Sequence, residues 1–339
     1  MKALVTGATG LIGSHMVDRL LQRGDSVRAL VRPTGDTSYL KTLDIELFPG
    51  DICDPASLRD AVAGVEAVYH AAAMVSDWGP WSAFAAGTIE GTRNMLEAAC
   101  AAGVPRFLHV STDSVYPTRE KLKGITIGED FPLEKQPPAW DYYQRSKLAA
   151  ERIAWDYHNS ARIQLSAVRP TLVLGERDRS IIPEILAYLR AGRAVYVGRP
   201  EGRWHCIYAG DLAEACILAA TREEAIGQVY NLGAEALTQR EFFAAVAEEI
   251  GVSPPRRTLP FWPIYLYGAL SETWARFTRS SRRPTMTRFG ALTLAQDYIL
   301  DTTKIERELG WKAQVSVREA IRLSIEWLKT QREPQRAVG

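Results

Sequence analysis

Tyr143 and Lys147 stand four positions apart in the stretch YYQRSK, residues 142–147. On a helix, positions i and i+4 share one face, so the two side chains can act on one ligand together. A tyrosine alone is a poor acid at neutral pH, because its ordinary pKa is about 10. A lysine ammonium close by favours the phenolate and lowers that pKa. The pair therefore predicts a proton donor or acceptor, Tyr143, that Lys147 tunes.

Three glycines near the N-terminus indicate which reaction could use that proton. Gly7, Gly10 and Gly13 follow the apolar run KALVTG (2–7) and open the helical pattern GSHMVDRLLQRG (13–24). Glycines at such a turn let the backbone approach a pyrophosphate, whose charge the helix N-terminus stabilises. The alternative is that they serve only strand–helix packing. Their place after the first strand of an alternating chain favours a dinucleotide-binding site.

The first half of the chain alternates short β-branched runs with helical patterns, which is typical of a parallel sheet covered on both faces. We therefore predict an α/β protein with a doubly wound parallel sheet, the Rossmann fold. The expected strands lie at residues 2–7, 26–31, 45–51, 67–73, 106–111 and 164–170. Residues 1–174 would form this dinucleotide-binding domain.

The second half is less regular. Residues 175–332 predict mainly a smaller, C-terminal substrate-binding domain, with helices at 180–193, 238–251 and 317–331. Segments near 205–233 are expected to return to the first domain, above all a strand at 229–233 that would join the main sheet. The two domains would therefore interleave.

Several motifs, in this order, resemble those of the extended short-chain dehydrogenase/reductase superfamily, the NAD-dependent epimerase/dehydratase superfamily. They are TGATGLIG (6–13), GDICD (50–54), HAAA (70–73), STDSVY (111–116), YQRSK (143–147) and RPTLVLG (169–175). The resemblance implies that residues 51–52 lie beside the adenine, residues 71–73 along the ribose and phosphates, and residues 170–173 against the nicotinamide. The cofactor-binding residues that it implies are Gly7, Thr9, Gly10, Leu11, Ile12, Gly13, Asp51, Ile52, Ala71, Ala72, Ala73, Tyr143, Lys147, Pro170 and Val173.

The same resemblance implies a catalytic hydroxyl at Thr112, three residues ahead of Val115 in STDSVY. It would hold the substrate oxygen while Tyr143 moves a proton and hydride passes between substrate carbon and nicotinamide. The alternative for Thr112 is a capping hydroxyl at a strand end. One position departs from the family: Thr88 stands where an asparagine is common, which puts a proton-relay role there in doubt.

The choice between NADP and NAD depends on the end of the second strand, ALVR. An acidic residue there would bind the ribose 2′-hydroxyl of NAD. Arg32 could instead pair with a 2′-phosphate, so NADP is favoured and NAD is the alternative. An ordinary exposed arginine is the other interpretation of Arg32.

The substrate class depends on positions where sugar-nucleotide enzymes of the superfamily carry polar anchors. Here Leu172 replaces an asparagine that serves the diphosphate, and Trp204 and His205 replace an Arg-Asp pair. Ser114 stands where the 4,6-dehydratases place a glutamate. The pattern is more similar to the branch of 3β-hydroxysteroid dehydrogenases and dihydroflavonol reductases. That resemblance implies a hydroxyl or ketone on an apolar skeleton: a steroid, a flavonoid-like ring system or a β-hydroxy/β-keto acid.

Two aromatic segments, 75–81 and 260–277, could supply the walls or lid of an apolar pocket. Core packing or a dimer contact is the alternative for each tryptophan. Segment 260–277 is too polar to span a bilayer, which leaves an interfacial helix open. Two other functions also remain open: a sugar-nucleotide epimerase with tightly bound NAD, and a non-catalytic dinucleotide sensor.

The composition of the chain limits which binding partners and which cellular compartment we expect. Lys and Arg number 41 against 40 Asp and Glu, with no like-charged block, so neither nucleic acid nor an acidic membrane face is indicated. Four cysteines lie far apart without metal-ligand spacing, so we expect no metal and buried free thiols in a reducing cytoplasm. The resemblance adds a homodimer. The N-terminal residues lack the pattern of a signal peptide.

Overall fold

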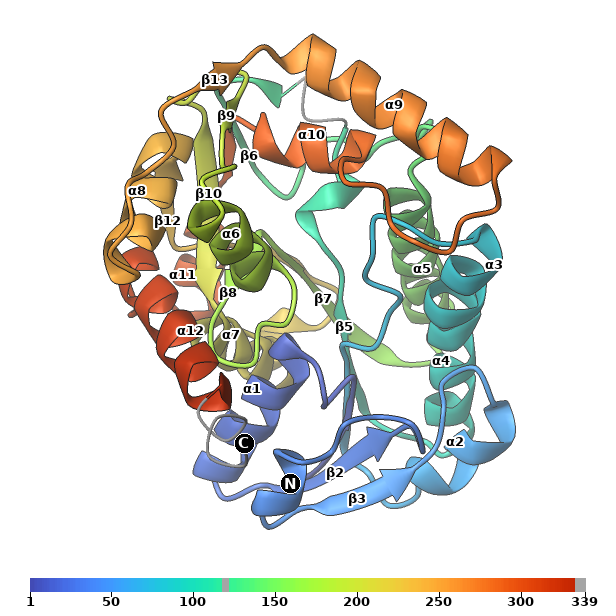
Figure 1. The fold of residues 1–339 in the computed structure, drawn as a ribbon. Helices are drawn as coiled ribbons and strands as arrows, with labels where there is room; N and C mark the ends of the chain where they lie inside the picture. Colours follow the sequence, from blue (N-terminus) through green and yellow to red (C-terminus); the bar gives the residue numbers. More distant parts are fainter. Residues whose placement is uncertain (118–121, 333–339) are drawn as a thin grey trace, which may run out of the picture.

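A computed structural model describes residues 1–117 and 122–332, and its centre is a seven-stranded sheet in which every pairing is parallel (Figure 1). The strand order is β11-β7-β5-β4-β1-β2-β3. Their bounds are β1 (Lys2–Thr6), β2 (Ser26–Val31), β3 (Glu46–Pro49), β4 (Ala67–His70), β5 (Arg106–Val110), β7 (Gln164–Pro170) and β11 (Val229–Leu232). The predicted doubly wound Rossmann fold is confirmed.

Apolar side chains on both faces of each strand explain why the sheet is covered twice. On β1, Ala3 and Val5 pack into one core and Leu4 into the other, as the two-residue period of a strand requires. Helices α1 (Leu11–Gln22) and α7 (Ala209–Thr221) cover the first face. Helices α2 (Pro55–Ala61), α4 (Gly91–Ala101) and α5 (Tyr142–Asn159) cover the second.

A second sheet lies beside the first. Its order is β12-β10-β14-β6, and β8 also pairs with β10. The bounds are β6 (Ile125–Ile127), β8 (Leu172–Leu174), β10 (Arg203–Tyr208), β12 (Glu235–Thr238) and β14 (Tyr298–Leu300), with helices α6 (Ile181–Arg190), α8 (Gln239–Glu249) and α12 (Val317–Arg332) packed on them. Of the segments expected to return to the first sheet, α7 and β11 do so, whereas β10 belongs to the second sheet.

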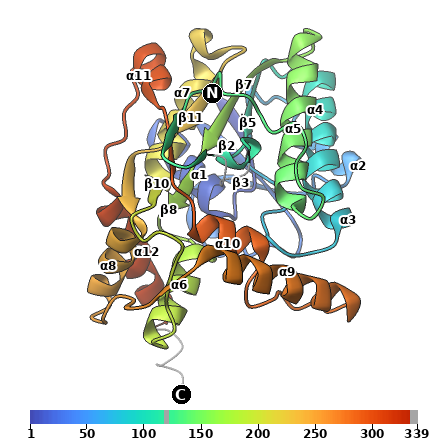
Figure 2. The same ribbon diagram turned by 90° about the horizontal axis from the view of Figure 1, so that it is seen from above.

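Other helices and strands lie outside these two sheets. They are α3 (Trp81–Phe84), a π-helical turn (Ala85–Glu90), β9 (Tyr196–Val197), β13 (Thr258–Leu259), α9 (Phe261–Phe277), α10 (Arg288–Leu294) and α11 (Thr303–Leu309). Strand β9 pairs with β13 in a small sheet of two strands. Seen from above, α9 extends along the outer edge of the molecule (Figure 2).

Two expectations from composition can be compared with this fold. All four cysteines are free, but only Cys206 and Cys216 are buried, so burial was wrongly expected for exposed Cys53 and half-buried Cys100. None of the helices within residues 1–117 and 122–332 combines the length and the apolar character that crossing a bilayer requires.

Candidate active site

The predicted cofactor residues follow the carboxyl ends of the parallel strands, which share one edge of the sheet. Gly7 has φ +70, and a Cβ there would lie 2.9 Å from the backbone of residues 71 and 72 after β4. A Cβ at Gly13 would lie 2.2 Å from the Gly7 carbonyl oxygen. These two glycines are therefore required by close backbone packing, which was the alternative to ligand binding.

Gly10 is different, because a side chain at this position would have more room than at Gly7 or Gly13. Among the described residues, a Cβ at Gly10 would meet only the Gly7 carbonyl oxygen, at 3.3 Å. Gly10 also caps α1 without a side-chain hydrogen bond, and the first turn, which holds Leu11 and Ile12, has no acidic residue. A helix N-terminus of this kind fits a pyrophosphate. The residues present thus fit a bound dinucleotide.

The residues expected to bind the adenosine lie in the loops that follow β2 and β3. The Ile52 carbonyl oxygen accepts a hydrogen bond from Asn94 Nδ2 at 2.8 Å, which ties this segment to α4. Asp51 Oδ1 accepts from the Cys53 amide at 2.9 Å. Arg32 is exposed directly after β2 and is close enough to lower the pKa of the Cys53 thiol, although burial raises that pKa more. No acidic side chain ends β2.

Lys147 lies at the carboxyl end of β5. Its Nζ donates to the Val110 carbonyl oxygen at 2.7 Å, at the end of β5, and the side chain is 5% exposed. Burial lowers the pKa of Lys147 to about 8, and the Glu151 carboxylate one turn later opposes that shift. Tyr143, one turn earlier on α5, packs its ring edge-on against Phe289 at 5.8 Å.

The start of α5 is fixed to the loop that carries Thr112. Asp141 caps the helix by accepting from the Gln144 amide at 2.9 Å. Gln144 Nε2 in turn donates to the carbonyl oxygens of Ser114 and Tyr116, at 2.8 and 2.9 Å. These bonds hold the first turn of α5, with Tyr143, against the end of β5.

Thr112 makes the capping contact that its alternative interpretation predicted. Its Oγ1 accepts from the Ser114 amide at 3.2 Å and donates to Asp113 Oδ1 at 3.2 Å. A hydroxyl has two acceptor positions and a rotatable hydrogen, so the cap leaves Thr112 able to contact a ligand oxygen. Asp113 Oδ2 accepts from Tyr298 Oη at 2.6 Å, which links this loop to β14.

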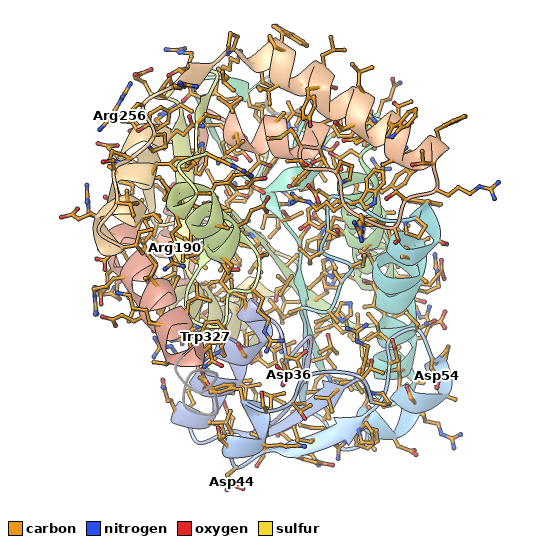
Figure 3. All side chains as sticks on the ribbon, in the orientation of Figure 1. Asp36, Asp44, Asp54, Arg190, Arg256 and Trp327 are labelled. Carbon is orange, nitrogen blue, oxygen red and sulfur yellow. The ribbon has the colours of Figure 1, made fainter. Side chains whose placement is uncertain are left out.

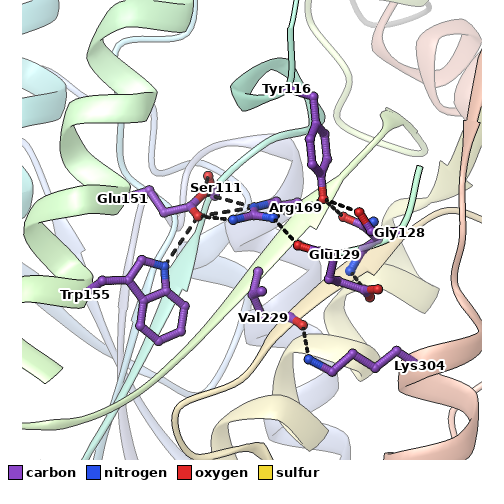
Figure 4. A network of polar contacts seen from close by, with 10 residues as sticks. Ser111, Tyr116, Gly128, Glu129, Glu151, Trp155, Arg169, Val229 and Lys304 are labelled. Atoms are coloured by element: carbon purple, nitrogen blue, oxygen red, sulfur yellow. Dashed lines mark hydrogen bonds and ion pairs between the residues drawn. The ribbon is translucent and has the colours of Figure 1, made fainter. Parts of the chain in front are cut away.

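A buried polar network supports the middle of α5 (Figure 4). Arg169 Nε donates to both carboxylate oxygens of Glu151, at 3.2 and 3.3 Å, and its Nη1 donates to Tyr116 Oη at 3.0 Å. Ser111 Oγ donates to Glu151 as well, and Tyr116 Oη donates to Asn231 Oδ1 at 2.8 Å. The network joins α5, β5, β7 and β11. The sequence interpretation missed it, although Glu151 stands four residues after Lys147.

Two adjacent hollows open beside Tyr143. The first is lined by Asp77, Trp78, Gly79, Phe84, Trp140, Asp141, Tyr142, Tyr143, Glu272, Arg276 and Phe289. The second is lined by Asp113, Ser114, Tyr116, Pro117, Asp141, Gln144, Phe289, Leu292 and Tyr298. Segment 75–81 therefore forms a wall that includes Trp78. Helix α9 contributes the charged side chains of Glu272 and Arg276, whereas its aromatic side chains line neither hollow, so the aromatic wall expected from segment 260–277 is not found there.

An ionic clamp closes one side of the first hollow. Arg283 donates to both carboxylate oxygens of Asp77, at 2.6 and 2.7 Å, and to Glu184 Oε1 at 2.9 Å. Thr287 Oγ1 donates to Asp77 Oδ2 at 2.7 Å. The loop after β4, α6 and the segment before α10 are thereby joined.

Other residues singled out in the sequence have structural contacts. His205 Nδ1 accepts a hydrogen bond from the Leu300 amide at 3.0 Å. His205 lines neither hollow, so these hollows give no support to a substrate contact at His205. Thr88 Oγ1 accepts from the Met74 amide at 3.0 Å, which holds the loop after β4. Pro170 ends β7, and Val173 is buried in β8. No metal-binding group of His, Cys, Asp and Glu occurs in the part of the chain that the structure describes.

Comparison with known proteins agrees with this geometry. The profile of the "NAD dependent epimerase/dehydratase family" matches residues 3–233. A 2-alkyl-3-oxoalkanoate reductase of Shewanella oneidensis is 28% identical over 332 residues, which cover 94% of this chain and 84% of that protein. A 3 beta-hydroxysteroid dehydrogenase/Delta 5→4-isomerase of Mycobacterium tuberculosis is 28% identical over 335 residues, with 94% and 88% covered.

A solved structure is similar over the whole chain. DesIV, a dTDP-glucose 4,6-dehydratase of Streptomyces venezuelae crystallised with NAD, has a TM-score of 0.76 and 26% identity, and 98% of each chain is covered. The similar proteins therefore include a 3-oxoalkanoate reductase, a hydroxysteroid dehydrogenase and a sugar-nucleotide dehydratase.

Proposed function

Because this chain belongs to the NAD dependent epimerase/dehydratase family, we propose that it is an NAD(P)-dependent oxidoreductase acting on a hydroxyl or ketone of an apolar substrate. The observation that carries the proposal is Lys147, hydrogen-bonded at the end of β5, one helical turn from Tyr143, which lines an aromatic hollow. The finer preference is for a β-keto acid with an apolar tail.

The residues have distinct roles in this proposal. The bound nicotinamide supplies the hydride chemistry. In the reducing direction Tyr143 gives its phenol proton to the substrate carbonyl oxygen, and Thr112 donates a hydrogen bond to the same oxygen. Lys147, held by the Val110 carbonyl oxygen, favours the phenolate that Tyr143 becomes and binds the nicotinamide ribose. Oxidation of the alcohol reverses each step.

The walls of the first hollow favour a β-keto acid. Trp78, Phe84, Trp140 and Phe289 give it aromatic side chains, beside the carboxyl groups of Asp77, Asp141 and Glu272. Arg276 lines the same hollow, where its guanidinium lies 4.8 Å from the Tyr142 ring centre, and it makes no ion pair with a described carboxylate. A 3-oxoalkanoate offers a carboxylate to that cation and an alkyl chain to the aromatic rings.

The rival function, a sugar-nucleotide epimerase with retained NAD, has support from the similarity to DesIV. Arg276 could also meet a diphosphate. Two positions oppose it: Leu172 cannot donate a hydrogen bond to phosphate, and Ser114 stands where a 4,6-dehydratase places its glutamate.

A direct test compares Tyr143→Phe with the matched control Tyr142→Phe. Both phenols line the first hollow, but only Tyr143 is assigned the proton. With a 2-alkyl-3-oxoalkanoate and NADPH or NADH, we expect Tyr143→Phe to lose about 10²–10⁴ in kcat while cofactor still binds. Tyr142→Phe should stay within about threefold of the native rate. Turnover retained by Tyr143→Phe, or epimerisation of UDP-glucose without net oxidation, would refute the proposal.

NADP is the proposed cofactor. Arg32 is exposed after β2, where no carboxylate would repel a 2′-phosphate. We also propose a cytoplasmic homodimer formed through two helices of the first sheet, and sedimentation would test its stoichiometry.

A further inference from the structure

Helix α9 presents its apolar side to solvent. Its outer face carries the large apolar side chains of Trp262, Leu266, Tyr267, Leu270, Trp274 and Phe277, which are between 52% and 81% exposed. Apart from the adjacent pair Leu266 and Tyr267, their successive spacings are three or four residues, which places them on one side of the helix. Within residues 1–117 and 122–332, Val75 is the one other large apolar side chain exposed to this degree.

The orientation of α9 is fixed by its inner face, so the exposed apolar side is not free to turn inward. Gly268 packs so closely that a Cβ there would lie 2.8 Å from the Thr287 backbone. Glu272 is buried, and its carboxylate accepts from the Arg288 amide, Nε and Nη2 at 2.6 to 2.8 Å. The buried side of this helix thus carries the charge, opposite to an ordinary surface helix.

Arginines flank this apolar face at both ends. Arg256 and Arg257 precede α9, and Arg279 and Arg282 follow it. None of these four forms an ion pair with a carboxylate in the described part of the chain. Between residues 251 and 296 the one acidic residue is Glu272, which Arg288 neutralises. The chain segments that flank the apolar face of α9 at both ends are therefore basic.

We propose that the outer face of α9 docks on an anionic phospholipid bilayer, with the helix lying in the plane of the membrane surface. Side chains project from this edge in Figure 3. Exposed Trp, Tyr, Leu and Phe suit the boundary between headgroups and acyl chains. The flanking arginines suit anionic headgroups, each near-surface cation contributing about 1 kcal/mol.

A second copy of the chain fits this face less well. A twofold interface brings the same patch of two subunits together. In either direction of helix pairing, each basic end of one α9 would meet a basic end of the other, with no acidic residue to offset the repulsion. Anionic lipid offers the complementary charge.

The docking surface also has a consequence for substrate access. The inner side of α9 contributes Glu272 and Arg276 to the first hollow. The helix that would touch the bilayer therefore also lines the proposed active site, so docking would bring this hollow close to the membrane surface.

Flotation with phospholipid vesicles tests the proposal. We expect the native protein to bind vesicles of phosphatidylcholine with about 30% phosphatidylglycerol, and to bind pure phosphatidylcholine at least about tenfold less. Leu270→Ser/Trp274→Ser should lose at least about tenfold in binding to the anionic vesicles. Arg279→Glu/Arg282→Glu should lose a similar factor. Val75→Ser removes an exposed apolar side chain that does not belong to α9, and this variant should bind like the native protein.

Thermal unfolding and turnover of a water-soluble ketone should be unchanged in Leu270→Ser/Trp274→Ser, because both side chains point to solvent. No flotation of the native protein on anionic vesicles would overturn the proposal. So would equal losses from Val75→Ser, or a native dimer that Leu270→Ser/Trp274→Ser converts to a monomer, since the face would then bind another copy.

Discussion

Replacing Lys147 with methionine should make the protein more stable at neutral pH, against the usual direction of mutations in a core. Burial lowers the pKa of this lysine from its ordinary 10.5 to about 8. One pKa unit corresponds to about 1.4 kcal/mol, so the charged form costs the fold about 3 kcal/mol. Loss of the hydrogen bond to the Val110 carbonyl oxygen offsets about 1 kcal/mol of that gain. The expected net stabilisation at pH 7 is about 2 kcal/mol.

The pH dependence makes this prediction specific. Between about pH 8 and 10.5 the unfolded chain still holds the lysine proton while the native chain has released it, so native stability rises with pH across that window. Lys147→Met has no such proton, so the difference in unfolding free energy by which it exceeds the native protein should shrink over the same pH range. Urea unfolding of the cofactor-free proteins at several pH values measures the difference. Lys312→Met, at an exposed site, is the control and should show little change.

Two outcomes would refute this reasoning. Lys147→Met could be less stable than the native protein at pH 7, or the difference between the two proteins could stay constant up to pH 10.5. Either result would mean that burial does not destabilise the charged form of Lys147. The variant should still lose turnover, because the ammonium that tunes Tyr143 is gone.

Three further predictions concern other parts of the site. Glu151→Gln leaves a buried guanidinium without its counter-charge, so urea unfolding should show a loss of about 3–5 kcal/mol, against under about 1 kcal/mol for the exposed-pair control Glu201→Gln. Gly13→Ala places a Cβ 2.2 Å from a carbonyl oxygen, and fluorescence titration should show at least about tenfold weaker NADPH binding. Arg32→Ala should raise KM for NADPH about tenfold and leave KM for NADH unchanged, as steady-state rates will show.

The fold and the family followed from patterns that are local in sequence. Short apolar runs alternating with helical periodicity predicted the main sheet, because each strand there is buried on both faces. Motifs in order predicted an NAD(P)-dependent enzyme of the extended short-chain dehydrogenase/reductase type, which is confirmed. They also predicted the 3β-hydroxysteroid dehydrogenase-like branch, and a member of that branch is among the similar proteins. The division of the chain at residue 174 and the roles of the site residues stay predictions.

What the sequence did not predict depends on contacts between distant segments. The pairing of Glu151 with Arg169 joins a helix to a strand 18 positions away, and local patterns predict the two elements but not which of their side chains meet. The balanced total charge concealed the basic ends of α9, because the carboxylates that balance it lie elsewhere in the chain. Which side of α9 faces outward was fixed by Gly268 and Glu272, whose partners lie in the segment around α10.

Strand β11 is synthesised well after its partner β7, which affects folding during translation. Its residues, 229–232, pair with β7, whose last residue leaves the ribosome about 60 positions earlier. Until then β7 has an unpaired edge, and one face of the sheet lacks α7. Nascent chains that have passed residue 170 but not 232 should thus be the ones that chaperones capture, and a product ending at residue 174 should aggregate.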